Sequence, residues 1–422
     1  MQLTYKFLYY KENKPLDKLC HFSNDLYNQA LYIVKQELNK NKKWLRYQDL
    51  NKIMRTTKNL DGEINYYKLK VQTAQQILRL LDKNWSSYFR SIKDYKTHPQ
   101  KYKGVPKAPD FRKSGDMNLL IYTNQNARIR SGKIILANDL TIEIPEYRGH
   151  NFTKFSQIRI LPRKGYYKIE IIYEKDCLSP VLDQDNFLSI DLGVDNLASC
   201  ITKDRAFILS GKTIKSVNQW YNKTRAEQRS FQDKKGKDLK ICNKKFSQLS
   251  FMRSTFIRDQ FHKMSRLLIN YCLENKIGTL VVGYNVDWKD SINIGKVSNQ
   301  KFAAIPYKSF LKFLEYKCKL VGIIFISNEE SYTSKCDGLA LEELGCHGKY
   351  LGQRKERGIF QSSTGRLINA DINGALNILR KVIGNSSFIK EIVNSVVLFN
   401  PVKIRFPEIN SGQTLSNLLL KC

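Results

Sequence analysis

The spacing of apolar residues divides the chain into a first part with helices followed by short strands and a second part with buried strands between helices. Apolar side chains recur every three to four residues over 15–38, which predicts a helix with one buried stripe, and a second helix is predicted over 67–92. Over 118–174 apolar and polar residues alternate with period two between tight turns. Several short strands of this kind predict a small β-barrel.

The second part begins near Asn186 with the run FLSIDLGVDNLASCITKD, which predicts a buried strand, a turn containing glycine and another strand. A strongly basic helical region is predicted over 212–275. The apolar runs GTLVVGYN and VGIIFISN then flank a helix over 309–319, which favours a parallel crossover and an α/β sheet. A last helix is expected over 371–383, and residues 385–422 are expected to be irregular.

The net charge of the chain limits the kinds of molecule that it is expected to bind. The chain has 71 Lys and Arg residues against 39 Asp and Glu residues, a formal net charge of +32 that excludes most ordinary metabolic enzymes. A folded chain with this excess attracts polyanions, so nucleic acid is the first partner to consider and a membrane surface the weaker alternative. No apolar run approaches the ~18–20 residues that span a bilayer, and residues 1–11 alternate like a strand, so we expect a cytoplasmic protein with no membrane partner. Its nine cysteines are irregularly spaced and expected to be reduced.

Two aspartates occupy positions suited to metal chemistry. Asp191 ends a buried strand directly before Leu192 and Gly193, and Asp371 stands at the start of the last helix. Each alone is equally compatible with a structural role, because Asp also caps turns and helix N-termini. Together they are better evidence, since Mg²⁺ prefers carboxylates and water, and paired ions stabilise the attacking and leaving oxygens of a phosphodiester.

Several motifs, taken in order, carry a resemblance to a known family. They are YTNQN, SIDLGVDNLAS, the helix FHKMSR, FAAIP, LEYK, ESYTSKC and RLINADINGALNI. With these motifs the chain, from about Pro15 to Val382, closely resembles the TnpB proteins of insertion-sequence transposons, which are relatives of the miniature type V CRISPR effectors.

The resemblance implies a multidomain α+β protein. Residues 1–185 would form an N-terminal wedge β-barrel with a helical recognition insert at about 15–95, and residues 186–384 an RNase H-like α/β RuvC domain. A C-terminal tail, 385–422, would follow. The RuvC domain would contain the basic helical region 212–275 and a degenerate zinc-ribbon insert, 333–368.

Carried over by position, Asp191 matches the family's first RuvC aspartate and Asp371 its last. The family's middle glutamate is missing, because Gly283 stands at its place, and Asp287 falls in a turn beyond the strand end. Glu329 and Glu330 follow the neighbouring strand, about one strand spacing of ~5 Å away, so we expect one of them to replace that glutamate. An exposed loop pair is the alternative, and Glu330 is slightly favoured.

The family's usual four-cysteine ribbon is also absent. Its two C-x-x-C pairs would fall at Asp337 and Ala340 and at Gln361 and Thr364. Cys336, Cys346 and His347 are three possible ligands at an unsuitable spacing, and tetrahedral zinc needs four. No structural zinc is therefore expected.

The function implied by the resemblance is RNA-guided cleavage of DNA beside a short transposon-adjacent motif. It would use Mg²⁺ or Mn²⁺ and a noncoding guide RNA from the transposon end. The sequence does not determine the oligomeric state, and a monomer is favoured. The alternative is a nuclease-inactive, RNA-guided repressor, which Gly283 would support. A plain transposase or RNA chaperone would explain the charge but not the two aspartate motifs.

Overall fold

The chain is described from a computed structural model, in which it divides into two compact units, Met1–Asp176 and Cys177–Cys422. The residues described are 1–10, 12–137, 139–145, 152, 154–163, 165–235, 239–285, 304–395 and 400–405, without the side chains of 232–235 and 239–244. Within these ranges, none of the helices has the length and apolarity that crossing a bilayer requires.

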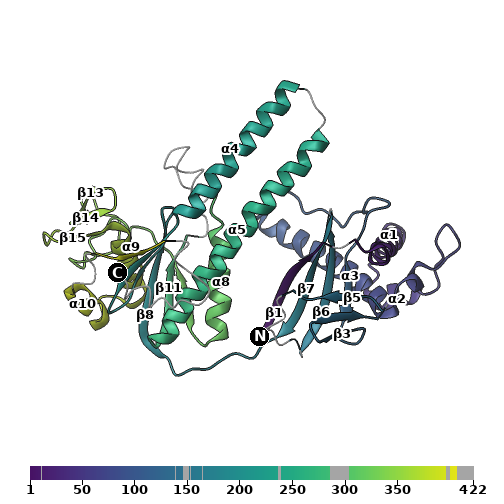
Figure 1. The fold of residues 1–422 in the computed structure, drawn as a ribbon, viewed down its shortest axis with the longest axis horizontal. Coiled ribbons are helices and arrows are strands. Elements are labelled where there is room, and N and C mark those ends of the chain that lie inside the picture. Colours follow the sequence, from purple (N-terminus) through teal and green to yellow (C-terminus); the bar gives the residue numbers. More distant parts are fainter. Residues whose placement is uncertain are drawn as a thin grey trace. The chain divides into compact units, whose positions relative to one another are not determined.

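The first unit combines three helices with two antiparallel sheets (Figure 1). Its strands are β1 (Gln2–Tyr9), β2 (Leu120–Thr123), β3 (Ala127–Arg130), β4 (Lys133–Leu136), β5 (Thr141–Glu143), β6 (Phe155–Arg163) and β7 (Tyr166–Glu174). Its helices are α1 (Lys14–Asn41), α2 (Tyr47–Met54) and α3 (Val71–Thr97), with short 3₁₀ turns η1 (Asn65–Lys68) and η2 (Pro99–Lys101). Asn13 caps α1 by accepting a 3.0 Å hydrogen bond from the Leu16 N–H, which confirms the expected helix start.

The expected β-barrel is not closed in the described part of the chain. Four strands pair in the order β1-β7-β6-β2, and β3, β4 and β5 form a separate sheet. Closure would require β1 to pair with β2, but these two strands lie at opposite edges of the four-stranded order. The period-two spacing correctly predicted strands here, but it does not determine which strands pair at the edges of a sheet.

The second unit is built on a six-stranded sheet in the order β12-β11-β8-β9-β10-β16. Its main strands are β8 (Asp183–Leu192), β9 (Asn196–Ile201), β10 (Ala206–Ser210), β11 (Ile277–Gly283) and β12 (Ile324–Asn328), with β16 (Val402–Ile404) at one edge. β8, β9 and β10 are antiparallel neighbours, whereas β11 runs parallel to both β8 and β12. The predicted parallel crossover is therefore confirmed.

Helices cover both faces of this sheet. The helices of the described part of this unit are α4 (Lys212–Lys235), α5 (Leu239–Glu274), α8 (Tyr307–Leu320), α9 (Ala370–Ile383) and α10 (Ser387–Asn394). α9 packs on β8, β9 and β11, and its apolar side chains share a core with Ile201 and Val281. The opposite face meets α5, where the rings of Phe207 and Tyr271 lie 5.2 Å apart. α4 and α5 together form a long helical hairpin (Figure 1).

Two smaller parts complete the unit. An insert between β12 and α9 contains the three-stranded sheet β13 (Gln353–Glu356), β14 (Ile359–Gln361) and β15 (Leu367–Asn369). The expectation that residues 385–422 are irregular is wrong where they are described, because α10 packs its apolar side into the core and β16 extends the main sheet beside β10. These segments are too short for periodicity to identify them.

A buried lysine connects two helices of this unit. Lys317 of α8 is 3% exposed, and its ammonium donates to the His262 carbonyl at 2.7 Å and to Ser265 Oγ at 2.6 Å, both in α5. The His262 ring stacks on Phe313 with 4.0 Å between ring centroids. The FHKMSR and LEYK motifs therefore meet at the α5–α8 contact.

The Lys317 ammonium should give the stability of this unit a measurable pH dependence. Burial, with a smaller repulsion from Arg266, lowers the pKa of Lys317 from 10.5 to about 7. Between these values the unfolded chain binds more protons than the folded chain, so the free energy of unfolding rises with pH and the gain is complete only above 10.5. We expect wild type to gain a few kcal/mol relative to Lys317→Met across this interval.

Urea denaturation of both proteins at several pH values within the interval measures this difference. The exposed Lys319, two residues further along α8, provides the matched control Lys319→Met, which should follow wild type. Equal pH slopes for wild type and Lys317→Met would contradict the assignment.

Candidate active site

The ends of three strands bring the candidate residues to one edge of the sheet. β8, β11 and β12 are parallel, so their carboxyl ends lie together. Val282 pairs with Ile190 on one side and with Ser327 on the other. Asp191 is the next residue of β8, and Gly283 ends β11 beside Asn328.

Helix α9 lies against this edge with three residues at helical spacing on the side that faces the sheet. Asn369 caps the helix by accepting from the N–H groups of Asp371 and Ile372, so Asp371 stands in its first turn. A Cβ atom on Gly374 would lie 2.6 Å from Asp191 Oδ2, and one on Gly283 would lie 2.4 Å from Ile378 Cδ1. Both glycines therefore allow the close approach of helix and strands, and a larger residue at either position would force these side chains to move.

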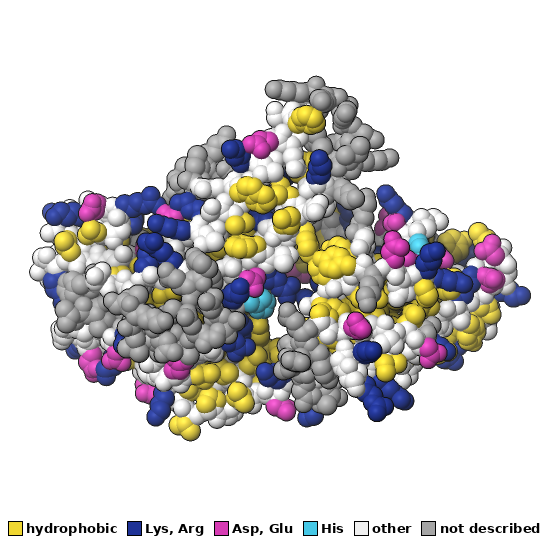
Figure 2. Space-filling model, viewed as in Figure 1, with side chains coloured by type: hydrophobic (Ala, Val, Ile, Leu, Met, Phe, Trp, Pro, Cys, Tyr) yellow, Lys and Arg dark blue, Asp and Glu magenta, His cyan; other side chains and the backbone are white. Residues whose placement is uncertain are grey.

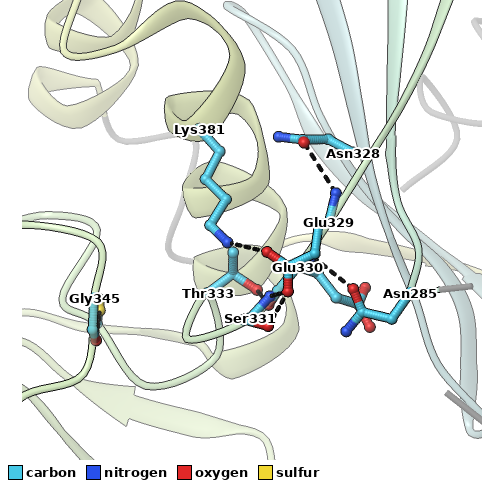
Figure 3. Close-up of polar contacts among 9 residues, drawn as sticks. Asn285, Asn328, Glu329, Glu330, Ser331, Thr333, Gly345 and Lys381 are labelled. Atoms are coloured by element: carbon cyan, nitrogen blue, oxygen red, sulfur yellow. Dashed lines mark hydrogen bonds and ion pairs between the residues drawn. The ribbon is translucent and has the colours of Figure 1, made fainter. Parts of the chain in front are cut away.

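Gly283 also leaves the space that Glu330 occupies. A Cβ atom at this position would lie 2.9 Å from Glu330 Oε2. The main-chain N–H of Glu330 donates to Asn285 Oδ1 at 3.1 Å, which ties the segment after β12 to the segment after β11 (Figure 3). The carboxylate of Glu330 thus lies beside the place where the sequence lacks an acidic residue.

The adjacent Glu329 is directed elsewhere. Its Oε2 pairs with the Lys381 ammonium of α9 at 2.8 Å, and its Oε1 accepts from the Ser331 N–H at 2.7 Å (Figure 3). Although burial acts in the opposite direction, Lys381 and Ser331 hold the pKa of Glu329 below its usual value. The structure therefore separates the two glutamates that sequence spacing left as alternatives.

Burial and repulsion between neighbouring carboxylates disfavour the charged forms of the acids in this site. Burial, followed by the charges of Glu330 and Asp371, raises the pKa of Asp191 well above its usual value. Burial and then Glu329 raise the pKa of Glu330 to about 7, against a smaller lowering by Lys381. Within the described residues, Glu330 Oε2 is buried without a hydrogen-bond partner. A cation would relieve each of these penalties.

Two residues that sequence spacing did not single out contact the site. Asn196, at the start of β9, donates from Nδ2 to Asp371 Oδ2 at 2.6 Å. Tyr307, buried at the start of α8, donates to the Gly193 carbonyl at 2.8 Å. Burial and then Asp191 and Glu330 raise the pKa of Tyr307, which places its ring close to both acids. Their only sequence signal was membership of the DNLAS motif and proximity to FAAIP.

Two further sequence expectations concern metals. Asp287 lies outside the described residues. Throughout the described ranges, no three His, Cys, Asp or Glu side chains form a cluster ready to hold a metal ion. In the insert, Cys336 is buried and its thiol approaches the Gly345 carbonyl at 3.8 Å, while Cys346 is exposed. The expectation of no structural zinc remains a prediction.

The helical hairpin carries a mixed apolar and basic surface. Figure 2 shows apolar side chains over α4 and α5 beside Lys and Arg side chains. Trp220, Phe231 and Met252 are half-exposed or more there. Arg253 of α5 lies over the Tyr221 ring of α4, 4.9 Å from its centroid, and also donates to Asn218. These contacts join the two helices of the hairpin.

Two family models and one curated protein match this chain. The OrfB_IS605 family, described as a probable transposase, matches residues 168–289, and the Cas12f1-like TNB domain matches residues 307–378. The TnpB-like protein ORF457 of Acidianus two-tailed virus is 24% identical over 358 residues, which cover 75% of this chain and 74% of that protein.

Two solved structures show a similar fold at low sequence identity. The cryo-EM structure of a Cas12f1–sgRNA–target DNA complex matches with a TM-score of 0.52 and 14% identity, over 86% of this chain and 82% of that chain. The mini-RNA-guided endonuclease CRISPR-Cas_phi3 matches with a TM-score of 0.51 and 10% identity, over 90% of this chain and 92% of that chain. The two domain matches and the viral relative thus make the chain similar to TnpB-like proteins over most of its length, and the two solved structures show a similar fold.

Proposed function

We propose that this protein is an RNA-guided DNA endonuclease of a transposon, which cuts target DNA beside a short transposon-adjacent motif by metal-dependent hydrolysis. One observation carries the proposal. The absent side chain of Gly283 leaves room for Glu330 Oε2 at the sheet edge that also carries Asp191. The missing family glutamate is thereby replaced by a carboxylate from the next strand.

We assign the second unit as an RNase H-like RuvC nuclease domain and the first as the recognition and wedge part. The strand order of the second unit supports this assignment, because an antiparallel run β10-β9-β8 is extended by the parallel strands β11 and β12. The acids lie at the carboxyl ends of β8 and β12 and at the N-terminus of α9.

The residues present fit a hard divalent cation such as Mg²⁺ or Mn²⁺. Asp191, Glu330 and Asp371 would hold it, since carboxylate oxygens are the ligands these ions prefer and no described residue hydrogen-bonds to the buried Glu330 Oε2. Such ions usually bind through one or two carboxylates, with water and substrate phosphate as further ligands, so a preformed three-acid cluster is not required. When bound, the ion would activate water and offset charge on the scissile phosphate.

The chain's own residues orient these acids. Asn196 donates to one oxygen of Asp371, and we assign the other oxygen to the ion. Lys381 draws Glu329 away, so its charge does not compete with Glu330 for the same position. Tyr307 holds the Gly193 carbonyl in the turn after Asp191. Because these contacts precede substrate binding, less ordering is needed during catalysis.

The partners we propose are a guide RNA and target DNA. The net charge of +32 supplies cations for backbone contacts, and the structurally similar Cas12f1 was solved with sgRNA and target DNA. In this chain the α4–α5 hairpin, with Trp220 exposed, is the surface we assign to the guide–target heteroduplex.

Cleavage by the ribonucleoprotein tests the proposal directly. Protein copurified with its noncoding RNA should cut members of a random DNA library beside one short motif when Mg²⁺ or Mn²⁺ is present, and its binding should weaken steeply with salt. Sequence-specific DNA binding without RNA would contradict it. Guided binding without cutting by either ion would instead support the nuclease-inactive repressor.

The two glutamates provide a matched pair of substitutions. Glu330→Gln should reduce guided cleavage by about 100-fold or more while target binding is retained, because it removes the buried carboxylate. Glu329→Gln removes an exposed carboxylate from the adjacent position and should cut at a rate close to wild type. Cleavage rates under single-turnover conditions and filter binding of target DNA measure both effects; the opposite order would assign the role to Glu329.

Gly283→Ala tests whether the space beside Gly283 is needed for packing and for cleavage. The new Cβ would crowd Ile378 and Glu330, so we expect a loss of about 1–3 kcal/mol in stability together with slower cleavage. Gly345→Ala is the control, because a Cβ atom there meets nothing within 4 Å. Thermal denaturation and cleavage rates should separate the two variants, and a Gly283→Ala protein equal to wild type in both would exclude this packing.

A further inference from the structure

The insert between β12 and α9 contains a fully buried acid, Asp337. Its Oδ1 accepts from the N–H groups of Leu339 and Ala340 in its own turn, at 3.1 and 3.2 Å. Its Oδ2 accepts from Ser362 Oγ at 2.8 Å, from the Ser363 N–H at 2.7 Å and from Ser363 Oγ at 3.0 Å. One carboxylate therefore joins the turn after Cys336 to the turn after β14.

The surroundings of Asp337 balance its charge. Its own N–H donates to Glu342 Oε2 at 2.6 Å, and the other oxygen of Glu342 accepts from the Leu351 N–H at 2.8 Å. The Arg380 guanidinium of α9 donates to the Glu342 carbonyl at 2.7 Å. Burial lowers the pKa of Arg380, against smaller raising effects of Cys336, Asp337 and Glu342, so the cation lies near both buried acids.

The turn closed by Asp337 is bound directly to α9. Asn373 donates to the Cys336 carbonyl at 2.9 Å and accepts from the Gly338 N–H at 2.9 Å. Asn377, one turn later, donates to the carbonyls of Thr333 and Cys336. A Cβ atom on Gly338 would lie 2.8 Å from Asn373 Oδ1, so this contact requires glycine.

On α9, Asn373 and Asn377 bind the insert. The residue after each of them, Gly374 and Ile378 respectively, contacts the strand ends at Asp191 and Gly283. We propose that Asp337 is a positioning residue, whose hydrogen bonds close the insert without a metal ion and thereby hold α9, with Asp371, against the ends of β8 and β11. The consequence for cleavage rests on the proposed function, but closure of the insert does not.

A carboxylate suits this role better than its neutral isostere. Three of the five groups that donate to Asp337 are main-chain N–H groups, which can only donate, and they reach both of its oxygens. Asn would place an NH₂ group against some of those donors, so that at least one main-chain or hydroxyl hydrogen would lose its acceptor. Buried donors left without acceptors are costly.

Asp337→Asn therefore tests the proposal, with Glu343→Gln as a control that removes an exposed carboxylate from the same insert. We expect Asp337→Asn to lower the melting temperature by about 5–10 °C and to expose the insert to protease, while Glu343→Gln matches wild type. A chelator should leave the melting temperature of wild type unchanged. Wild-type stability and protease resistance in Asp337→Asn, or a stoichiometric zinc whose removal lowers the melting temperature, would overturn the proposal.

Positioning is tested well below the melting temperature. There Asp337→Asn should bind guided target as wild type does but cut it about 10-fold or more slowly, because α9 is less well fixed. Ser363→Ala, which removes one of the five donors, should show a smaller loss, and Gly338→Ala should slow cleavage with Asp337 intact. Unchanged cleavage by folded Asp337→Asn would overturn the positioning role. If wild type itself does not cut, the stability and protease results still decide whether Asp337 closes the insert.

Discussion

The close approach of α9 to the ends of β8 and β11 is the constraint on which the rest of the site depends. Two glycines permit it, since a Cβ on Gly374 would meet Asp191 and one on Gly283 would meet Ile378. The approach is held by Ser189 Oγ, which donates to the Ala375 carbonyl at 2.7 Å inside the core. With helix and strands this close, a carboxylate at the strand end has few positions available to it.

This close approach also changes how the glycine at position 283 should be interpreted. A side chain at 283 would displace the observed carboxylate of Glu330, because its Cβ atom would lie 2.9 Å from Glu330 Oε2. Glycine at the position of a missing acid is therefore not by itself a sign of lost function. In the proposed site it is the condition under which an acid from the neighbouring strand can enter.

Much of the second unit could be predicted from local pattern. The strand that ends at Asp191, the parallel crossover and the helix that begins near Asp371 depend on apolar periodicity and short turns, which sequence displays directly. The different contacts of Glu329 and Glu330 could not be predicted, since Glu329 pairs with Lys381, which is 52 residues away. Closure of a barrel and the strand at 402–404 also depend on long-range pairing that periodicity does not encode.

The acidic site is notable in a chain with a net charge of +32. Distant cations do little for Asp191 and Glu330 because solvent ions screen exposed charges beyond about 10 Å, whereas burial and neighbouring carboxylates act at short range. Both pKa values are accordingly raised despite the overall charge. The hydrogen bonds that hold α9 maintain this unfavourable grouping in the absence of a cation. A divalent ion that binds together with a nucleic-acid phosphate would remove this repulsion between the acids, and that relief would strengthen its binding.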